Sequence, residues 1–329
     1  MSQPLVQVRD LRKSFGNLEA VRGISFDIFP GQVIGFIGAN GAGKTTTMRM
    51  MATLDLPSSG SIQIGGRDVL NFPNEVRRLI GWMPDAYGTY DNMSVLEYLD
   101  FYARAFGFRK AERHQRIEEV MDFTNLKSIC AQPMNKLSKG MAQRLCLGRT
   151  LLHDPDFLIL DEPAAGLDPK ARIEFKHLVR LLAEEGKTLF ISSHILSELG
   201  EMCDTMLFID AGQIVHHGSA ESLRNNDGAK GVAVEVRVAA GNEALLQWIE
   251  MNPNVELLEA TRQGARIRAL EETPEAMAVM LRKMIQDGLP VTEFHKEERK
   301  LEDAFVEILQ KVGGAVPPLP ATFNLAETL

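Results

Sequence analysis

A chain of 329 residues has room for one large domain and one small one, or for two of middling size. Its composition, 45% hydrophobic and 24% charged, is that of a globular protein with a sizeable buried core. A formal net charge of -8 argues against broad binding to nucleic acid or anionic lipid, although it does not exclude a small basic patch.

The cysteines and the apolar runs indicate a cytosolic setting. Cys130, Cys146 and Cys203 are scattered and show no metal-binding spacing, so we expect reduced thiols. The N-terminal sequence, MSQPLVQVRD, lacks the charged and apolar regions of a signal peptide. No uninterrupted apolar run approaches the roughly 20 residues that span a bilayer, so we expect no membrane-spanning helix.

Strands and helices alternate through the first two thirds of the chain. In chain order we expect strands at 5–8, 24–28 and 32–37, a helix from Lys44, a strand at 62–64, helices at 94–106, 111–123 and 139–152, a strand at 157–160, a helix at 169–184 and a strand at 188–192. Phosphate-type motifs at strand ends, with helices between the strands, predict an α/β fold with a parallel sheet. Ligands bind at the carboxyl edge of such a sheet.

The stretch GANGAGKTT, residues 38–46, matches the motif G-x-x-x-x-G-K-[ST]. It follows the expected strand 32–37 and opens a helix, so its backbone N–H groups and the helix N-terminus can surround phosphate. Lys44 would reach the β- and γ-phosphates, and the Thr45 hydroxyl would bind Mg²⁺. The alternative is an ordinary glycine-rich turn with a solvated lysine. The predicted nucleotide-binding residues of this loop are Gly38, Asn40, Gly41, Gly43, Lys44, Thr45 and Thr46.

Two acids, Asp161 and Glu162, directly follow the apolar run 157–160. Ionised carboxylates at the end of a buried strand are costly unless a cation meets them. We expect Asp161 to face Mg²⁺, as the second-motif acid of P-loop ATPases does, and Glu162 to act as general base on the attacking water. Alternatively, both are solvated acids at the start of a loop.

A second, smaller domain is expected after a polar linker at 224–231. Its order of elements, βαββαβ, predicts a ferredoxin-like α+β module. The elements are a strand at 232–238, a helix at 242–250, strands at 255–260 and 265–270, a helix at 273–287, a strand at 290–294 and a helix at 300–311. We therefore divide the chain into residues 1–225, an accessory domain at 226–311 and a proline-marked flexible tail at 312–329.

The stretch LSKGMAQRL, residues 137–145, resembles the signature motif of the ATP-binding subunits of ABC transporters. The resemblance covers about residues 4–222, and the motif lies where that family has it, about 100 residues after Gly38 and 20 before Asp161. It implies a P-loop ATPase cassette with a helical subdomain at about 85–155. It also implies that Ser138 and Gly140 complete the ATP site of a second cassette, so that two ATP molecules lie between two cassettes.

The same resemblance implies roles for further residues. Asp168, in AGLD, would link the two sites, and His194, in ISSHIL, would touch the γ-phosphate. Phe15 would stack on adenine, or it is a core residue. Asp85 stands where most members have a glutamine that binds Mg²⁺, so Thr45, Asp85 and Asp161 form the expected metal set. We expect Asp85 to give slower or differently coupled hydrolysis than glutamine, because it adds negative charge near the γ-phosphate.

The function implied is Mg²⁺-dependent ATP hydrolysis that drives transport through a separate membrane permease. ATP would drive the pairing of two cassettes, which we expect to form a homodimer, with two different cassettes as the alternative. LSKGM and LEDAFVEIL, residues 301–309, resemble the ABC-2 export type. The chain would lie peripherally at the cytoplasmic side of the membrane and bind no nucleic acid. Permease docking is expected near residues 85–102, with Tyr87 and Tyr90 as exposed candidates, unless these aromatics are subdomain core. The alternatives are an ABC-type ATPase that acts on the ribosome or DNA, and an ATP sensor without useful turnover.

Overall fold

The computed structural model describes residues 3–296 except 87, 89, 91, 201, 220–230, 240 and 272. These residues divide between two compact units, one within residues 1–220 and the other within 221–304. The expected linker at 224–231, except Gly231, lies outside the described residues, as do the expected helix at 300–311 and the tail at 312–329. Within the described part of the chain, no helix has both the length and the apolar character needed to cross a membrane.

A six-stranded sheet forms the centre of the first unit, in the order β10-β9-β3-β8-β7-β6. All neighbours are parallel except β9 and β10, which form an antiparallel pair. Every residue of β3, β7 and β8 is buried, which is why these strands read as continuous apolar runs. The predicted parallel α/β fold is confirmed. The strands are β3 (Val33–Ile37), β6 (Ile80–Met83), β7 (Phe157–Leu160), β8 (Thr188–Ser193), β9 (Thr205–Asp210) and β10 (Gln213–Gly218).

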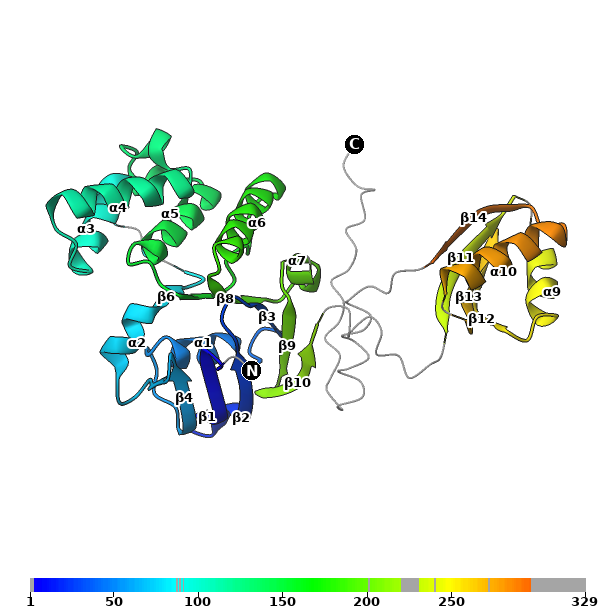
Figure 1. The fold of residues 1–329 in the computed structure, drawn as a ribbon, viewed down its shortest axis with the longest axis horizontal. Helices are drawn as coiled ribbons and strands as arrows, with labels where there is room; N and C mark the ends of the chain where they lie inside the picture. The colour runs from blue at the N-terminus through cyan, green and yellow to red at the C-terminus, as the bar shows by residue number, and fades with distance from the viewer. Residues whose placement is uncertain are drawn as a thin grey trace. The chain divides into compact units, whose positions relative to one another are not determined.

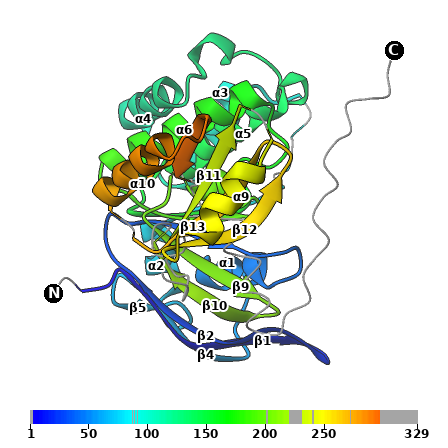
Figure 2. The same cartoon turned by 90° about the vertical axis from the view of Figure 1, so that its right-hand side faces the viewer.

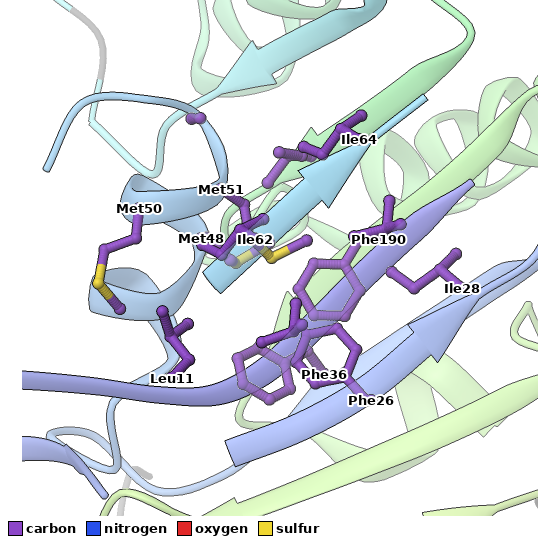
Figure 3. Close-up of a cluster of buried hydrophobic side chains, with 14 of the residues drawn as sticks. Leu11, Phe26, Ile28, Phe36, Met48, Met50, Met51, Ile62, Ile64 and Phe190 are labelled. Carbon is purple, nitrogen blue, oxygen red and sulfur yellow. The ribbon is translucent and has the colours of Figure 1, made fainter. Parts of the chain in front are cut away.

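A second, antiparallel sheet packs on the first through an aromatic and methionine core. Its order is β2-β1-β4-β5, with β1 (Val6–Phe15), β2 (Leu18–Ile28), β4 (Ser59–Ile64) and β5 (Arg67–Asp68). Phe26 of β2 stacks on Phe190 of β8 at a centroid distance of 5.8 Å, and Phe36 of β3 stacks on Phe190 at 5.0 Å (Figure 3). This core ties together the two sheets that flank the loop at 38–46.

Helices α3, α4, α5 and α6 lie on the opposite side of the central sheet from the antiparallel sheet (Figures 1 and 2). Helix α1 instead packs in the core that the two sheets share. Side-chain caps mark several starts: Ser94 and Glu97 form a capping box at α3, and Ser138 and Asp168 cap α5 and α6. The helices are α1 (Lys44–Met51), α2 (Pro73–Leu79), α3 (Val95–Ala105), α4 (Lys110–Phe123), α5 (Lys139–Leu151), α6 (Pro169–Glu184) and α7 (Leu196–Gly200). Short 3₁₀ turns lie at Lys127–Ile129 and Met134–Lys136.

The second unit has the predicted ferredoxin-like order of elements. Its sheet runs β12-β13-β11-β14 with every neighbouring pair antiparallel, and α9 and α10 cover one face (Figure 1). Alternate valines of β11 point into the core, whereas Glu235 and Arg237 between them lie on the other face. Its elements are β11 (Val232–Val238), α9 (Glu243–Glu250), β12 (Val255–Thr261), β13 (Gly264–Ala269), α10 (Pro274–Gln286) and β14 (Val291–Lys296).

Candidate active site

The loop at 38–46 leaves the carboxyl end of β3 and enters α1, as its motif requires. Two of its glycines are demanded by space: a Cβ on Gly38 would lie 2.3 Å from the Ile209 carbonyl oxygen, and one on Gly43 would lie 2.7 Å from that of Ala20. Gly43 also has a φ of 108°, which side chains rarely adopt. Asn40, Gly41 and Thr45 are exposed and Thr46 is half-buried, so the loop presents its tip to solvent.

Lys44 lies folded over this loop, with a relative exposure of 6%. Its Nζ donates hydrogen bonds to the carbonyl oxygens of Gly38 at 2.7 Å and Ala39 at 3.3 Å. It also lies 3.3 Å from Glu162 Oε1. A buried charge needs partners of this kind, and they fix the ammonium beside the loop at 38–46.

Asp161 is 1% exposed at the end of β7, where its backbone N–H donates to the Met83 carbonyl at 2.8 Å. Burial raises the pKa of its carboxyl above the usual value, and hydrogen bonds from Ser192 and Thr45 oppose that shift. The structure therefore brings Thr45 and Asp161 together. Asp85 is exposed, but it lies near enough for its charge to raise the pKa of Asp161 further.

Ser192 is a site residue that the sequence analysis missed. It is fully buried at the end of β8, and its Oγ donates to Asp161 Oδ1 at 2.6 Å while it accepts from the Glu162 backbone N–H at 2.8 Å. One hydroxyl thus fixes two successive acids. Glu162 has a φ of 47°, an uncommon conformation for this residue type, and its carboxylate lies against Lys44 instead of Ser192. The available signal was a polar pair, Ser192–Ser193, ending an otherwise apolar strand.

His194 follows β8 and contacts the Glu162 carboxylate. Its Nδ1 lies 2.8 Å from Glu162 Oε2, while the other carboxylate oxygen of Glu162 faces Lys44 Nζ. The His194 side chain is 44% exposed and the Glu162 side chain 13% exposed. The structure therefore gathers Lys44, Glu162 and His194, three of the predicted site residues, at the carboxyl edge of the central sheet.

The predicted signature residues lie at two helix starts. Ser138 Oγ accepts from the Met141 N–H at 3.3 Å, and Asp168 Oδ1 accepts from the Ala171 N–H at 2.9 Å, so each is an N-cap. A Cβ on Gly140 would lie 2.7 Å from Ala171 Cβ, which means that α5 packing on α6 itself requires glycine there. Across the described residues, no hydrogen bond or ion pair joins these helix starts to Lys44, Asp161 or Glu162.

Phe15 ends β1 and is 51% exposed, with Lys13 Nζ 4.8 Å from its ring centroid. This exposure rules out the core reading of Phe15. The aromatics expected at the docking region divide: Tyr98 is buried, whereas Tyr90 and Phe101 are 43% and 50% exposed. Tyr87 lies outside the described residues.

The oxygen donors near Asp161 suit a hard divalent cation. Thr45 and Asp161 supply a hydroxyl and a carboxylate that already meet, and Asp85 adds a nearby second carboxylate. Over the part of the chain that the structure describes, no group of three or more His, Cys, Asp or Glu side chains is arranged to hold a metal by itself. A hydroxyl and a carboxylate of this kind fit an ion that takes part of its coordination from a bound ligand, as Mg²⁺ does with phosphates.

Comparisons with known proteins agree with this geometry. A family model described as "ABC transporter" matches residues 21–165. The ABC transporter ATP-binding protein YxlF of Bacillus subtilis is 33% identical over 93% of this chain and 99% of its own. The Nod factor export ATP-binding protein I of Ralstonia nicotianae is 30% identical over 93% of this chain and 94% of its own. A solved structure of an ATP-binding subunit of an ABC transporter matches with a TM-score of 0.62 and 28% identity, over 68% of this chain and 93% of that one.

Proposed function

This chain belongs to the ABC transporter family of ATP-binding proteins and is an ATPase, and from that premise we propose that it hydrolyses ATP with Mg²⁺ to drive export through a separate membrane permease. Membership of the family confirms the resemblance noted in the sequence and establishes ATP as the nucleotide. The export direction is supported by the name of the Ralstonia relative, a Nod factor export protein. The metal, the permease and the residue roles below belong to the proposal.

The observation that carries the proposal is the contact chain Lys44–Glu162–His194, with separations of 3.3 Å and 2.8 Å. It places a fixed cation, a carboxylate and an imidazole together at the sheet edge beside the phosphate loop. A phosphate group in that loop is stabilised by backbone N–H groups, the α1 N-terminus and Lys44 Nζ. When Lys44 turns to phosphate, Glu162 Oε1 becomes available to a water molecule.

Glu162 is the proposed general base. A carboxylate can accept the proton of the attacking water, and His194 Nδ1 holds this carboxylate in place by hydrogen-bonding its other oxygen. Asp161 has a different task, because Ser192 and Thr45 hold it toward the start of α1. Thr45, Asp161 and Asp85 would hold Mg²⁺, which would offset the negative charge of the triphosphate.

A second cassette is proposed to complete the site. Ser138 and Asp168 cap helices whose N-termini carry partial positive charge, yet neither contacts Lys44, Asp161 or Glu162 within the described residues. Both helix starts can therefore serve the nucleotide of another copy, and we propose a homodimer. Gly140 has a double role in this proposal, since α6 packing demands glycine and phosphate approach would use it.

The permease is proposed to hold the protein peripherally at the cytoplasmic side of the membrane. Exposed aromatic side chains at Tyr90 and Phe101 support docking near residues 85–102, because large apolar side chains in contact with each other on a surface favour a partner. Co-purification of the full chain from membranes tests this point. A permease should accompany the parent protein and be reduced by Tyr90→Ser with Phe101→Ser; ribosomes or DNA in its place would contradict the proposal.

Glu162→Gln tests the catalytic assignment. We expect ATP binding to be retained while turnover falls by about 10²- to 10⁴-fold, the usual contribution of a general base. Glu184→Gln, at the end of α6 away from the site, is the matched control and should hydrolyse ATP at the parent rate. If Glu162→Gln also turned over ATP at the parent rate, Glu162 would not be the base.

A further inference from the structure

The second unit contains a hollow that no catalytic residue adjoins. It has a volume of about 240 Å³ and lies between α10, the end of α9 and the loop before β12. Its apolar lining comes from Trp248, Val255, Met277 and Met280. By share of liquid volume this is room for about eight water molecules, enough for one apolar body of ring size. We call this hollow the α9–α10 pocket.

The pocket exists because α10 covers its core incompletely. Met284 is the fully buried residue of this helix, while Met277 and Met280 pack only partly against the core. Val279, which also lines the pocket, is 59% exposed. A ligand that covers apolar side chains in a concave surface removes them from water, which lowers the free energy of the complex. Methionines suit such a wall, since their side chains adapt to differently shaped ligands.

Hydrogen bonds fix the polar groups at the Lys283 end of the α9–α10 pocket. Trp248 Nε1 donates to Asp287 Oδ2 at 2.7 Å, and Asn252 Nδ2 donates to the Trp248 carbonyl oxygen at 2.6 Å. Lys283 Nζ donates to Asn252 Oδ1 and lies 5.8 Å from the Trp248 ring centroid. Within the described residues, no carboxylate lies within 4 Å of this ammonium. Lys283 thus presents a positive charge, with donor capacity remaining, at the end of an apolar hollow.

One acidic side chain, Glu271, also lines the pocket. It precedes the N-cap of α10, Thr273, whereas Lys283 lies in the last turn of this helix. Among the described residues, no ion pair joins Glu271 to Lys283. The ammonium can therefore pair with an anionic group of a ligand.

We propose that the α9–α10 pocket binds a small amphipathic acid. Its apolar body would lie against Trp248, Met277 and Met280, and its carboxylate would accept hydrogen bonds from Lys283 Nζ. A hydrogen bond to a charged partner is stronger than one between neutral groups, so the anionic group determines which apolar molecules bind well. The site lies within one unit and uses none of the residues assigned to ATP hydrolysis.

Three probes with one apolar body test the proposal: 4-phenylbutyrate, 4-phenylbutanol and 4-phenylbutylamine, titrated calorimetrically into the full chain. We expect the carboxylate to bind at least about tenfold more tightly than the alcohol and the amine. Lys283→Met should abolish this preference while the alcohol still binds. Arg282→Met, a neighbouring exposed cation that does not line the pocket, should leave the preference intact.

Two further variants locate the site and guard against a folding defect. In a Trp82→Phe background Trp248 is the remaining tryptophan, and its fluorescence should change as the carboxylate binds. Ala276→Phe, which fills the pocket from α10, should weaken all three probes. The proposal is overturned if the carboxylate fails to bind at millimolar concentration, if the amine or alcohol binds as tightly, or if Lys283→Met keeps the preference.

Discussion

The two units handle charge in opposite ways. In the first, Lys44 and Glu162 form an ion pair whose side chains are 6% and 13% exposed, beside the buried Asp161. In the second, ion pairs such as Arg268–Glu256, with side chains 27% and 59% exposed, lie on the sheet face away from the helices. Exposed pairs contribute about 0–1 kcal/mol to folding, whereas removing one partner of a buried pair costs about 3–5 kcal/mol.

The buried charges of the first unit indicate a functional site. Burying two carboxylates side by side is costly, so Asp161 and Glu162 serve a purpose other than stability at that sheet edge. The exposed ion pairs on the sheet of the second unit do not indicate a functional site, because water solvates their charges. His295, exposed and 3.3 Å from Glu235, belongs to the same set of solvated charged residues.

Removing one cation from each unit should give the largest difference in ATPase rate between two variants. Lys44→Met deletes the charge that we propose to bind phosphate, so we expect ATP binding to weaken and turnover to fall by at least about 10²-fold. Arg268→Ala removes an exposed cation and should leave turnover at the parent rate. Steady-state ATPase assays, with circular dichroism to verify folding, measure both. Equal losses of ATP turnover in the two variants would contradict the assignment of the catalytic charges to the first unit.

Two buried hydroxyls of strand β8, Ser192 and Thr188, should differ in their effect on kcat. Ser192→Ala removes the bridge between Asp161 and Glu162, and we expect kcat to fall by about 10- to 100-fold with KM little changed, because a hydrogen bond to a charged group contributes about 1.5–3 kcal/mol. Thr188→Ala removes a buried hydroxyl from the other end of β8, where it accepts from the Gly31 N–H. That control should lose stability and keep its kcat. A loss of kcat in Thr188→Ala as large as in Ser192→Ala would refute the positioning role.

The smallest effect is expected for an exposed charge that acts on the buried group. Asp85→Gln should raise the ATPase rate a few-fold and raise the Mg²⁺ concentration needed for half-maximal rate, because it removes both a repulsive charge and the anionic ligand that we propose for Mg²⁺. Mg²⁺ titrations of the two proteins measure this. Identical rates and identical Mg²⁺ dependence would show that the departure from glutamine has no catalytic consequence.

Much of the fold could be predicted because its signals are local. Continuous apolar runs marked β3 and β7, an apolar run also marked most of β8, and the order of elements marked the second unit. The missed strands had weaker patterns: β6 is four residues long and contains glycine, and β10 is an edge strand buried only in part. β9, by contrast, has a buried apolar run at 206–209 that the same rule could have found.

The site residues also divide into those that local motifs predict and those that depend on tertiary contacts. Gly38, Lys44, Asp161 and Glu162 follow from motifs in which neighbouring residues act together. Ser192 could not be inferred in that way, since its two partners lie about 30 residues earlier and meet it only through the pairing of β7 with β8. The contact of Gly140 with Ala171 likewise depends on how two helices cross.

The most direct test of the whole account is the mass of Glu162→Gln in solution with ATP, measured by light scattering with and without Mg²⁺. If two copies close on ATP and hydrolysis separates them, this variant should form a dimer that retains one ATP per chain when ATP and Mg²⁺ are present. Lys44→Met in the same background should remain monomeric. A monomer without bound nucleotide in Glu162→Gln, at every Mg²⁺ concentration, would contradict the account.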